Sequence, residues 1–313
     1  MVKRIVVTNY LGESMEYKIE GVQEDDPSGL FITSIEGLGP AKANVNMTTL
    51  SVTDGNYYNS ARLEGKNIVI NGVFTNAYSI EDSRLLSYRY FPIKKKLNIK
   101  VYTDNRAGEI DGYVESNEPA IFSEKEGCQI SILCESATFS AIGESGITSG
   151  AFANVMPLFK FPFGNASLTE KLIKLGDIAD IRETVIEYLG DYETGMEIHI
   201  LVRGNVESDI SIFKDGDNAM ILKPSRISYI VPSPNNDKFV YGDEIVITTS
   251  QGKKGVKLIR GGNEYNILNV LEKNPDWFIF HRGENRFFYR TEDDTEDELL
   301  RFTLYAPKLY EGV

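Results

Sequence analysis

The sequence has very few of the residues that build disulfide frameworks, zinc sites and histidine-based catalytic sites. It holds two Cys, two His and one Trp in 313 residues. Cys128 and Cys134 fall within one run, 127–135, and six residues at ~3.3 Å each would place their thiols roughly 20 Å apart in a strand. A disulfide requires Cα atoms closer than about 7 Å, so both cysteines are predicted to be free and buried. No CxxC motif occurs and the two histidines lie far apart in sequence, so no metal site is predicted.

Long hydrophobic runs are absent as well. No segment approaches the ~18 consecutive apolar residues of a membrane span. The segment Met1–Val7 has a basic pair but no sustained apolar stretch, so it is predicted to be a first strand rather than a signal peptide. We therefore expect the chain to stay in the cytoplasm until it is assembled, without membrane insertion. A net charge of −13 argues against a broad surface for nucleic acid or anionic membrane, since both need an excess of Lys and Arg.

The sequence also lacks a recognisable catalytic constellation. No G-x-S-x-G elbow is present, and residues 37–42 resemble a phosphate loop only superficially because the GK[S/T] ending is missing. His199 alternates away from an apolar strand face and His281 precedes a turn, so both are predicted to be structural or surface residues. Carboxylates are abundant, but abundance does not reveal a catalytic pair. We predict neither an enzyme nor a cofactor.

What the sequence has in quantity is tyrosine and phenylalanine, 17 and 16 residues, which favour half-buried pleated surfaces and hence strands. Met196, Ile198, Ile200 and Val202 alternate with polar residues as one face of a strand does. One helix is predicted from Ser79, whose side chain fits an N-cap, to Phe91, because Pro92 stops it. The paired runs 97–103 and 109–116 predict a hairpin.

Turn formers and small residues divide the chain. Residues 140–157 are rich in them, so we predict a first domain at 1–142, a linker at 143–156 and a second domain at 157–313. A helical turn or two is expected at 168–175. Regular short strands in the second half favour an antiparallel sandwich. The acidic run 292–298 is predicted to be a solvated loop, because like charges this dense repel one another.

The order of several motifs resembles the bacteriophage distal tail protein family, which builds the hub of the tail baseplate. In the first half the matching segments are Ile32-Thr-Ser-Ile-Glu-Gly-Leu-Gly-Pro40, Thr53-Asp-Gly55 before Arg62, Asn67-Ile-Val-Ile70, Ser83-Arg-Leu-Leu-Ser-Tyr-Arg-Tyr-Phe-Pro92, Gly112-Tyr-Val-Glu-Ser116 and Gln129-Ile-Ser-Ile-Leu-Cys134. In the second half they are Phe159-Lys-Phe-Pro-Phe163, Gly190-Asp-Tyr-Glu-Thr-Gly195, Tyr241-Gly-Asp-Glu-Ile-Val-Ile-Thr-Thr249, Trp277 with Gly283-Glu-Asn285, and Tyr310-Glu-Gly-Val313. The acidic run 292–298 is particular to this sequence.

The resemblance implies a mainly β fold: an N-terminal ring-forming β-sandwich with one helix, and a C-terminal galectin-like antiparallel β-sandwich. It implies a homo-hexameric ring between the tail tube protein above and the tail tip or hub protein below. The second domain would face outward and support side fibres or receptor-binding proteins. The expected location is the virion tail tip. The residues expected at ring or partner contacts are Arg62, Arg84, Tyr88, Lys94, Lys95 and Lys96, the lysines being otherwise an ordinary solvated strand entry.

Two other functions compete with a structural hub. The second domain could act as a carbohydrate-binding module on the host cell wall, with Trp277 and His281 as candidate glycan-facing residues. A sole Trp beside Phe278, Ile279 and Phe280 is also what a core residue looks like. A cell-wall hydrolase is the remaining alternative. A similar fold does not decide among these functions.

Overall fold

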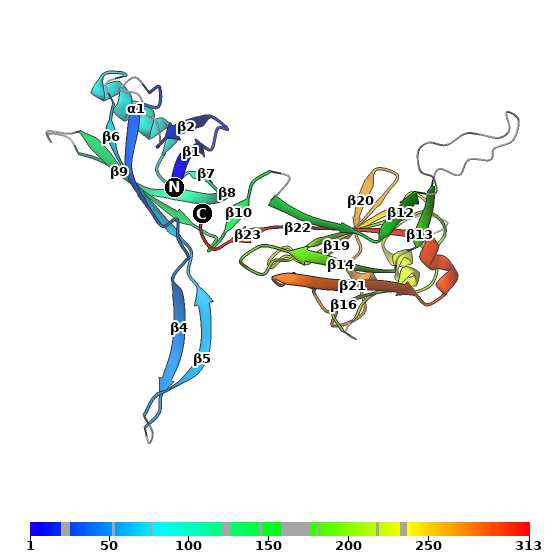
Figure 1. Ribbon diagram of the computed structural model, residues 1–313. Helices are drawn as coiled ribbons and strands as arrows, with labels where there is room; N and C mark the ends of the chain where they lie inside the picture. The colour runs from blue at the N-terminus through cyan, green and yellow to red at the C-terminus, as the bar shows by residue number, and fades with distance from the viewer. Residues whose placement is uncertain are drawn as a thin grey trace, which may run out of the picture. The chain divides into compact units, whose positions relative to one another are not determined.

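The protein consists of two compact units, which are described separately. A computed structural model describes residues 1–19, 26–51, 54–75, 77–120, 126–143, 146–157, 176–180, 182–216, 219–231 and 237–313. Unit 1 is formed by residues 1–146 together with 309–313, and unit 2 by residues 147–308. In the described part of the chain no helix has the length and apolar character needed to cross a membrane. Strands dominate both units, so the predicted mainly β fold is confirmed (Figure 1).

Unit 1 is built around one large antiparallel sheet. Its strands are β1 (Val2–Thr8), β2 (Ser14–Lys18), β3 (Leu30–Glu36), β4 (Ala43–Thr49), β5 (Asn56–Leu63), β6 (Asn67–Phe74), β7 (Lys96–Thr103), β8 (Ala107–Ala120), β9 (Gly127–Cys134), β10 (Phe139–Ala141) and β23 (Leu309–Tyr310). The order in the sheet is β2-β1-β7-β8-β9-β6-β3, with β10 and β23 beside β8. The end strands β2 and β3 contact each other, so the sheet curls around a single core. The predicted hairpin of β7 and β8 is confirmed.

The one helix of unit 1, α1 (Ile80–Tyr90), has the predicted limits. The side chain of Ser79 accepts a hydrogen bond from the backbone N–H of Asp82, as an N-cap does. At the other end the N–H of Phe91 donates to Ser87, and Pro92 prevents a further turn. Phe91 is fully buried and its ring lies 5.7 Å from that of Tyr17 on β2. The aromatic residue at the helix end therefore anchors α1 to the core of unit 1.

The last five residues of the chain are a structural part of unit 1. β23 pairs with β10, with Phe139 opposite Tyr310. The N–H of Val313 donates to the carbonyl of Leu38 at 3.1 Å. The buried ammonium of Lys66 donates to the carbonyl of Glu311 at 2.8 Å and also to that of Gly39. Unit 2 thus occupies the stretch of chain between two neighbouring strands of the unit 1 sheet.

Removing residues 309–313 is expected to lower the free energy of unfolding of unit 1 by about 1–3 kcal/mol, the cost of leaving a buried donor without its acceptor. Lys66 would lose the Glu311 carbonyl and β10 would lose a pairing partner. Native-state hydrogen exchange checks this through the amides of β10 and the N–H of Cys134, which donates to Lys66. Unchanged protection at these amides would contradict the expectation.

Unit 2 is a sandwich of antiparallel sheets, as predicted for the second half. Its strands are β11 (Ile147–Ala151), β12 (Ala153–Pro157), β13 (Gly176–Asp180), β14 (Glu183–Tyr188), β15 (Glu197–Val202), β16 (Ile210–Lys214), β17 (Ala219–Leu222), β18 (Glu244–Thr248), β19 (Gly255–Arg260), β20 (Asn263–Asn266), β21 (Gly283–Thr291) and β22 (Leu300–Pro307). One sheet has the order β11-β22-β15-β18-β19-β20 and the other β14-β21-β16-β17, while β12 and β13 pair separately. Three short 3₁₀ helices complete it: η2 (Pro224–Tyr229), η3 (Leu268–Val270) and η4 (Asp294–Leu299).

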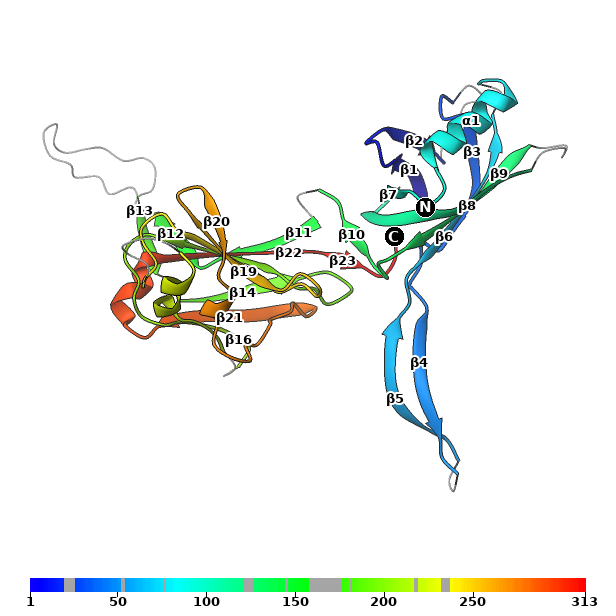
Figure 2. The ribbon, with the colours of Figure 1, turned by 180° about the vertical axis from the view of Figure 1, so that it is seen from behind.

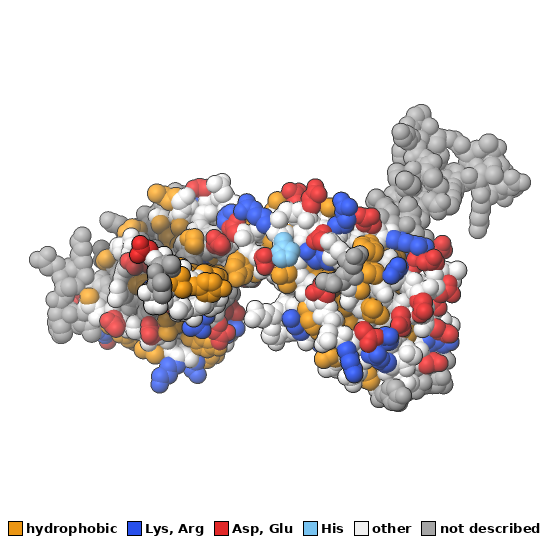
Figure 3. All heavy atoms as spheres, turned by 90° about the horizontal axis from the view of Figure 1, so that it is seen from below, with side chains coloured by type: hydrophobic (Ala, Val, Ile, Leu, Met, Phe, Trp, Pro, Cys, Tyr) orange, Lys and Arg blue, Asp and Glu red, His pale blue; other side chains and the backbone are white. Residues whose placement is uncertain are grey.

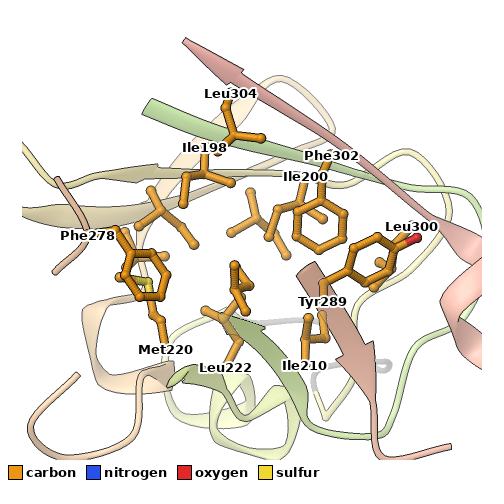
Figure 4. Packing of buried hydrophobic residues seen from close by; sticks show 14 of the residues in the cluster. Ile198, Ile200, Ile210, Met220, Leu222, Phe278, Tyr289, Leu300, Phe302 and Leu304 are labelled. Carbon is orange, nitrogen blue, oxygen red and sulfur yellow. The ribbon is translucent and has the colours of Figure 1, made fainter. Parts of the chain in front are cut away.

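The core of unit 2 lies between these two sheets (Figure 4). The predicted alternation along β15 is confirmed, since Ile198 and Ile200 are fully buried. Tyr289 of β21 stacks on Phe302 of β22 with ring centres 4.1 Å apart, and Phe152 meets both rings edge-on. Burial of such aromatic pairs supplies much of the energy of a small β core.

Two features of unit 2 differ from the sequence-based expectations. The segment predicted as a linker, 143–156, contributes β11, because Thr148 and Phe152 are buried despite their small-residue surroundings. The acidic run predicted as a solvated loop forms η4, and Asp297 within it is buried. Its carboxylate accepts from Thr291 at 2.6 Å and lies 3.0 Å from the guanidinium of Arg182. The helical turn expected at 168–175 and the segment Phe159–Phe163 lie outside the described residues.

Candidate assembly surface

Strands β4 and β5 form a two-stranded ribbon that stands apart from the unit 1 sheet. They pair only with each other, from Ala43 opposite Leu63 to Thr49 opposite Asn56. Figures 1 and 2 show the ribbon extending away from the sheet, on the side opposite α1. Each residue of the two strands except Leu63 is exposed. An isolated two-stranded hairpin is marginally stable in water at best, so this ribbon is a segment that gains most from a partner.

The ribbon has one apolar face and one polar face. Side chains alternate along each strand, so cross-strand partners share a face. The residues of the apolar face are Ala43, Val45 and Met47 on β4 and Tyr58, Ala61 and Leu63 on β5. Tyr58 and Met47 are 57% and 53% exposed, values typical of surface polar residues rather than of large apolar ones. Figure 3, which views the protein from below, shows hydrophobic side chains gathered on this side of unit 1.

The opposite face of the ribbon carries Asn44, Asn46, Thr48, Ser60 and Arg62. A register shift between Asn46 and Met47 leaves Asn59 as the extra residue of β5, and its amide donates to Thr48 at 2.7 Å. A bulge of this kind bends and twists a strand pair. The polar face suits solvent, whereas the apolar face suits burial against another protein surface.

A second uncovered surface lies on α1. The helix buries Ser83, Ser87 and Tyr90 toward the core and exposes Leu85 and Tyr88. This is the reverse of the usual amphipathic arrangement, in which the apolar stripe faces the core. A turn at residues 9–13 adds the exposed side chains of Tyr10 and Leu11 beside the end of the helix. That turn is tied to α1 because the amide of Asn9 donates to the carbonyl of Arg89 at 3.1 Å.

The carboxylate of Glu13 holds the same turn against the helix. It accepts hydrogen bonds from the guanidinium of Arg89 and from the amide of Asn9, and these bonds lower its pKa from 4.5 to about 2. We expect its titration, followed by NMR, to have a midpoint near pH 2. Because the folded-state pKa is lowered, its contribution to stability is complete above about pH 4.5 and is lost as the pH falls toward 2. In Arg89→Ala the midpoint should return toward 4.5; an unchanged midpoint would contradict this cause.

The structure places the six residues expected at ring or partner contacts in two separate regions. Arg84 and Tyr88 lie on α1, where Arg84 forms an ion pair with Glu81 at 3.6 Å. Lys94 and Lys95 follow the helix, and the ammonium of Lys95 lies 5.3 Å from the centre of the Tyr10 ring. Lys96 pairs with Asp111 at 2.8 Å, which raises the pKa of Lys96. Arg62 is distant from these because it belongs to the ribbon.

The two residues considered as glycan-facing have different surroundings. Trp277 is half-buried, packs against the core of unit 2 and is covered by the ammonium of Lys254 at 5.5 Å from the ring centre. His281 is exposed and its Nδ1 lies 2.7 Å from a carboxylate oxygen of Glu193. The indole is therefore a packing group, whereas the imidazole is available at the surface.

Reactive groups are few in the part of the chain that the structure describes. Cys128 and Cys134 are free and buried, as predicted, and burial raises their thiol pKa values to about 12 and about 11. A thiol with so high a pKa is a poor nucleophile. Among the described residues no group of three or more His, Cys, Asp or Glu side chains is arranged to hold a metal ion.

The fold can be compared with solved structures now that its units are defined. The crystal structure of the SPP1 Dit protein (gp 19.1), described as a paradigm of the hub adsorption apparatus in phages that infect Gram-positive bacteria, superposes with a TM-score of 0.62. The identity is 9%, over 97% of this chain and 98% of that one. Two structures of the phage P2 baseplate in its activated conformation, with Ca and with Sr, give TM-scores of 0.44 and 0.41 at 13% and 12% identity, with the same coverage. The sequence matches no family model and no curated protein.

The comparison confirms the predicted resemblance to phage distal tail proteins at the level of the fold. The likeness to SPP1 Dit covers nearly the whole of both chains, so both units take part in it. The uncovered ribbon was not predicted from the sequence. Its signals were the alternation of Ala43, Val45 and Met47 with polar residues and the Asp54-Gly55 turn beyond them.

Proposed function

We propose that the protein is a structural component of a bacteriophage tail in which six copies close into a hub ring. The observation that carries the proposal is the ribbon of β4 and β5, whose apolar face has no cover within unit 1. A neighbouring copy is the natural cover, because each chain presents both a ribbon and a sheet with an open edge at β3. A head-to-tail contact of this type either closes into a ring or grows into a filament, and closure protects every edge.

In the proposed ring, unit 1 supplies the contacts between copies and the contacts with the tail tube protein on one face and the tail tip or hub protein on the other. Arg62 lies on the ribbon and is assigned to the contact between copies. Arg84, Tyr88 and Lys94–Lys96 surround α1 and are assigned to a partner contact. Exposed Leu85 and Tyr88 together with basic side chains suit a protein partner with an apolar and acidic surface.

Unit 2 would face outward in this arrangement and support side fibres or receptor-binding proteins. The role is non-enzymatic, located at the virion tail tip after assembly in the bacterial cytoplasm. With a net charge of −13, the protein would repel DNA that passes through the ring rather than bind it, with or without sequence specificity. Tight association with DNA at low salt would contradict this part of the proposal.

Light scattering on the purified protein, with negative-stain images of the same sample, tests the ring. A species of six chains with a central hole supports the proposal. Ring closure in the presence of the tube or tip protein also supports it, because a growing tail can supply the template. A monomer that persists with both partners present would refute it.

A further inference from the structure

The outer face of the four-stranded sheet of unit 2 presents an aromatic pair between two arginines. Along β21 the outward side chains are Arg286, Phe288 and Arg290. Phe288 lies opposite Phe213 of β16, and their rings stack in parallel, 4.3 Å apart and 4° from coplanar. The guanidinium of Arg290 lies 5.2 Å from the centre of the Phe213 ring. Outward-facing aromatic rings held in a fixed orientation are unusual on a solvated sheet face and indicate a surface that meets a ligand.

Two hollows of about 380 Å³ each open on this face, one on either side of the aromatic pair. Val185, Phe288 and Arg286 line the first, with Asp215 and Glu284. The second is lined by Ser211, Ile221, Arg290 and Glu292, among others. A volume of this size lies at the low end of the ~300–1,000 Å³ range of small-ligand sites. Each hollow combines apolar surface with both donors and acceptors.

The charges on this face are largely paired with one another. Arg286 lies 3.3 Å from a carboxylate oxygen of Glu183. Asp215 accepts from the backbone N–H of Arg286 at 2.8 Å and from the ammonium of Lys214 at 2.5 Å. Burial tends to raise the pKa of Asp215, but the bond from Lys214 outweighs it and the charge of His281 adds to the lowering, so the carboxylate stays ionised. The face therefore offers hydrogen-bonding groups of both kinds without a large uncompensated charge.

We propose that this face of unit 2 is a binding site for a neutral oligosaccharide of pyranose sugars that lies along β21. The apolar side of a sugar ring would rest on Phe288 and Val185, and its hydroxyl groups would donate to Asp215 and Glu284 and accept from Arg286 or Arg290. An anionic polymer fits less well, because Arg286 already has a carboxylate partner. His281, considered from the sequence as glycan-facing, lies near this site, whereas Trp277 packs into the core.

A protein partner is the other occupant that an aromatic surface could take. The apolar surface is small, since Phe213 is only 7% exposed and Arg290 covers part of it. Stable protein interfaces bury roughly 1,200–2,000 Å² and have a wide apolar centre. The two hollows beside a narrow aromatic strip suit a thin, hydroxyl-rich chain better. This inference does not depend on ring formation.

Titration of the full-length protein with maltotriose, cellotriose and tri-N-acetylchitotriose, followed by calorimetry, tests the proposal. We expect saturable binding of at least one of the three. Val185→Glu should weaken that binding at least tenfold, which corresponds to about 1.4 kcal/mol. Leu201→Glu is the matched control, because Leu201 is 43% exposed on the outer face of the other sheet and Val185 is 48% exposed. Arg286→Gln, at an exposed position, provides a second variant in the same hollow should Val185→Glu not fold.

Three results would overturn the proposal. They are the absence of saturable binding by all three sugars, equal weakening by the site variants and by Leu201→Glu, and loss of binding to another tail protein in the site variants without any sugar binding. The ring assay run on the same samples keeps the two proposals distinct. A ring without sugar binding refutes the site alone, and sugar binding by a monomer refutes the ring alone.

Discussion

The double variant Val45→Asp/Met47→Asp is expected to abolish ring assembly and to leave the fold of unit 1 unchanged. Both side chains lie on the apolar face of the ribbon, and both are exposed in the single chain. A carboxylate costs little there in the monomer. In the ring it would be buried without a partner, and an unpaired charge in an interface costs about 2–5 kcal/mol. Six copies repeat the penalty, so the population of rings should fall by more than a thousandfold.

Light scattering measures the loss, and circular dichroism with thermal unfolding shows whether the monomer is intact. The matched control is Asn46→Asp/Thr48→Asp, which places the same charges on the polar face of the same strand. Rings should persist in that control. If both variants assemble as the native protein does, the apolar face of the ribbon is not the contact between copies.

Local signals in the sequence were sufficient for some elements and not for others. The limits of α1 follow from Ser79, Asp82 and Pro92, which act within one turn of the helix. The strand β15 follows from its strict alternation over a buried face. β4 and β5 lack both advantages, because they contain many Asn residues, which are depleted in strands, and bury nothing within unit 1.

Contacts between distant parts of the chain account for the remaining differences. Lys66 donates to the carbonyl of Glu311, 245 residues away, and no pattern near either residue predicts that bond. Asp297 sits in a run of acidic residues, and only Thr291 and Arg182 make its burial acceptable. For the candidate surface, Arg84, Tyr88 and Lys94–Lys96 come together because they are close in sequence. Arg62 is separated from them by the path of the ribbon.

Unit 2 should depend strongly on one buried ion pair, between Asp243 and Arg260. Asp243 is 1% exposed, and its carboxylate accepts from the Arg260 guanidinium at 2.8 and 2.6 Å and from the N–H of Val240 at 2.9 Å. Arg260 also donates to the carbonyl of Lys238 at 2.9 Å. The pair thus joins the start of β18, the end of β19 and the segment before β18. A bidentate geometry with every carboxylate oxygen used is the arrangement in which a buried pair offsets its desolvation.

Asp243→Ala is expected to lower the free energy of unfolding by about 3–5 kcal/mol, because it leaves the guanidinium in a buried site without its counter-charge. For a unit of this size the unfolding temperature should fall by roughly 6–15 °C, measured by calorimetry. Glu264→Ala is the control. It removes the pair with Lys257 at 3.1 Å, in which both side chains are exposed, and should cost less than about 1 kcal/mol.

The double variant Asp243→Ala/Arg260→Ala separates the two possible causes of the loss. If the unpaired charge dominates, removing the guanidinium as well should recover part of the stability, and the double variant should be less unstable than the sum of the single variants predicts. If lost packing dominates, the two effects should add. A cost for Asp243→Ala no larger than that for Glu264→Ala would mean that the join between β18 and β19 rests on the apolar core alone.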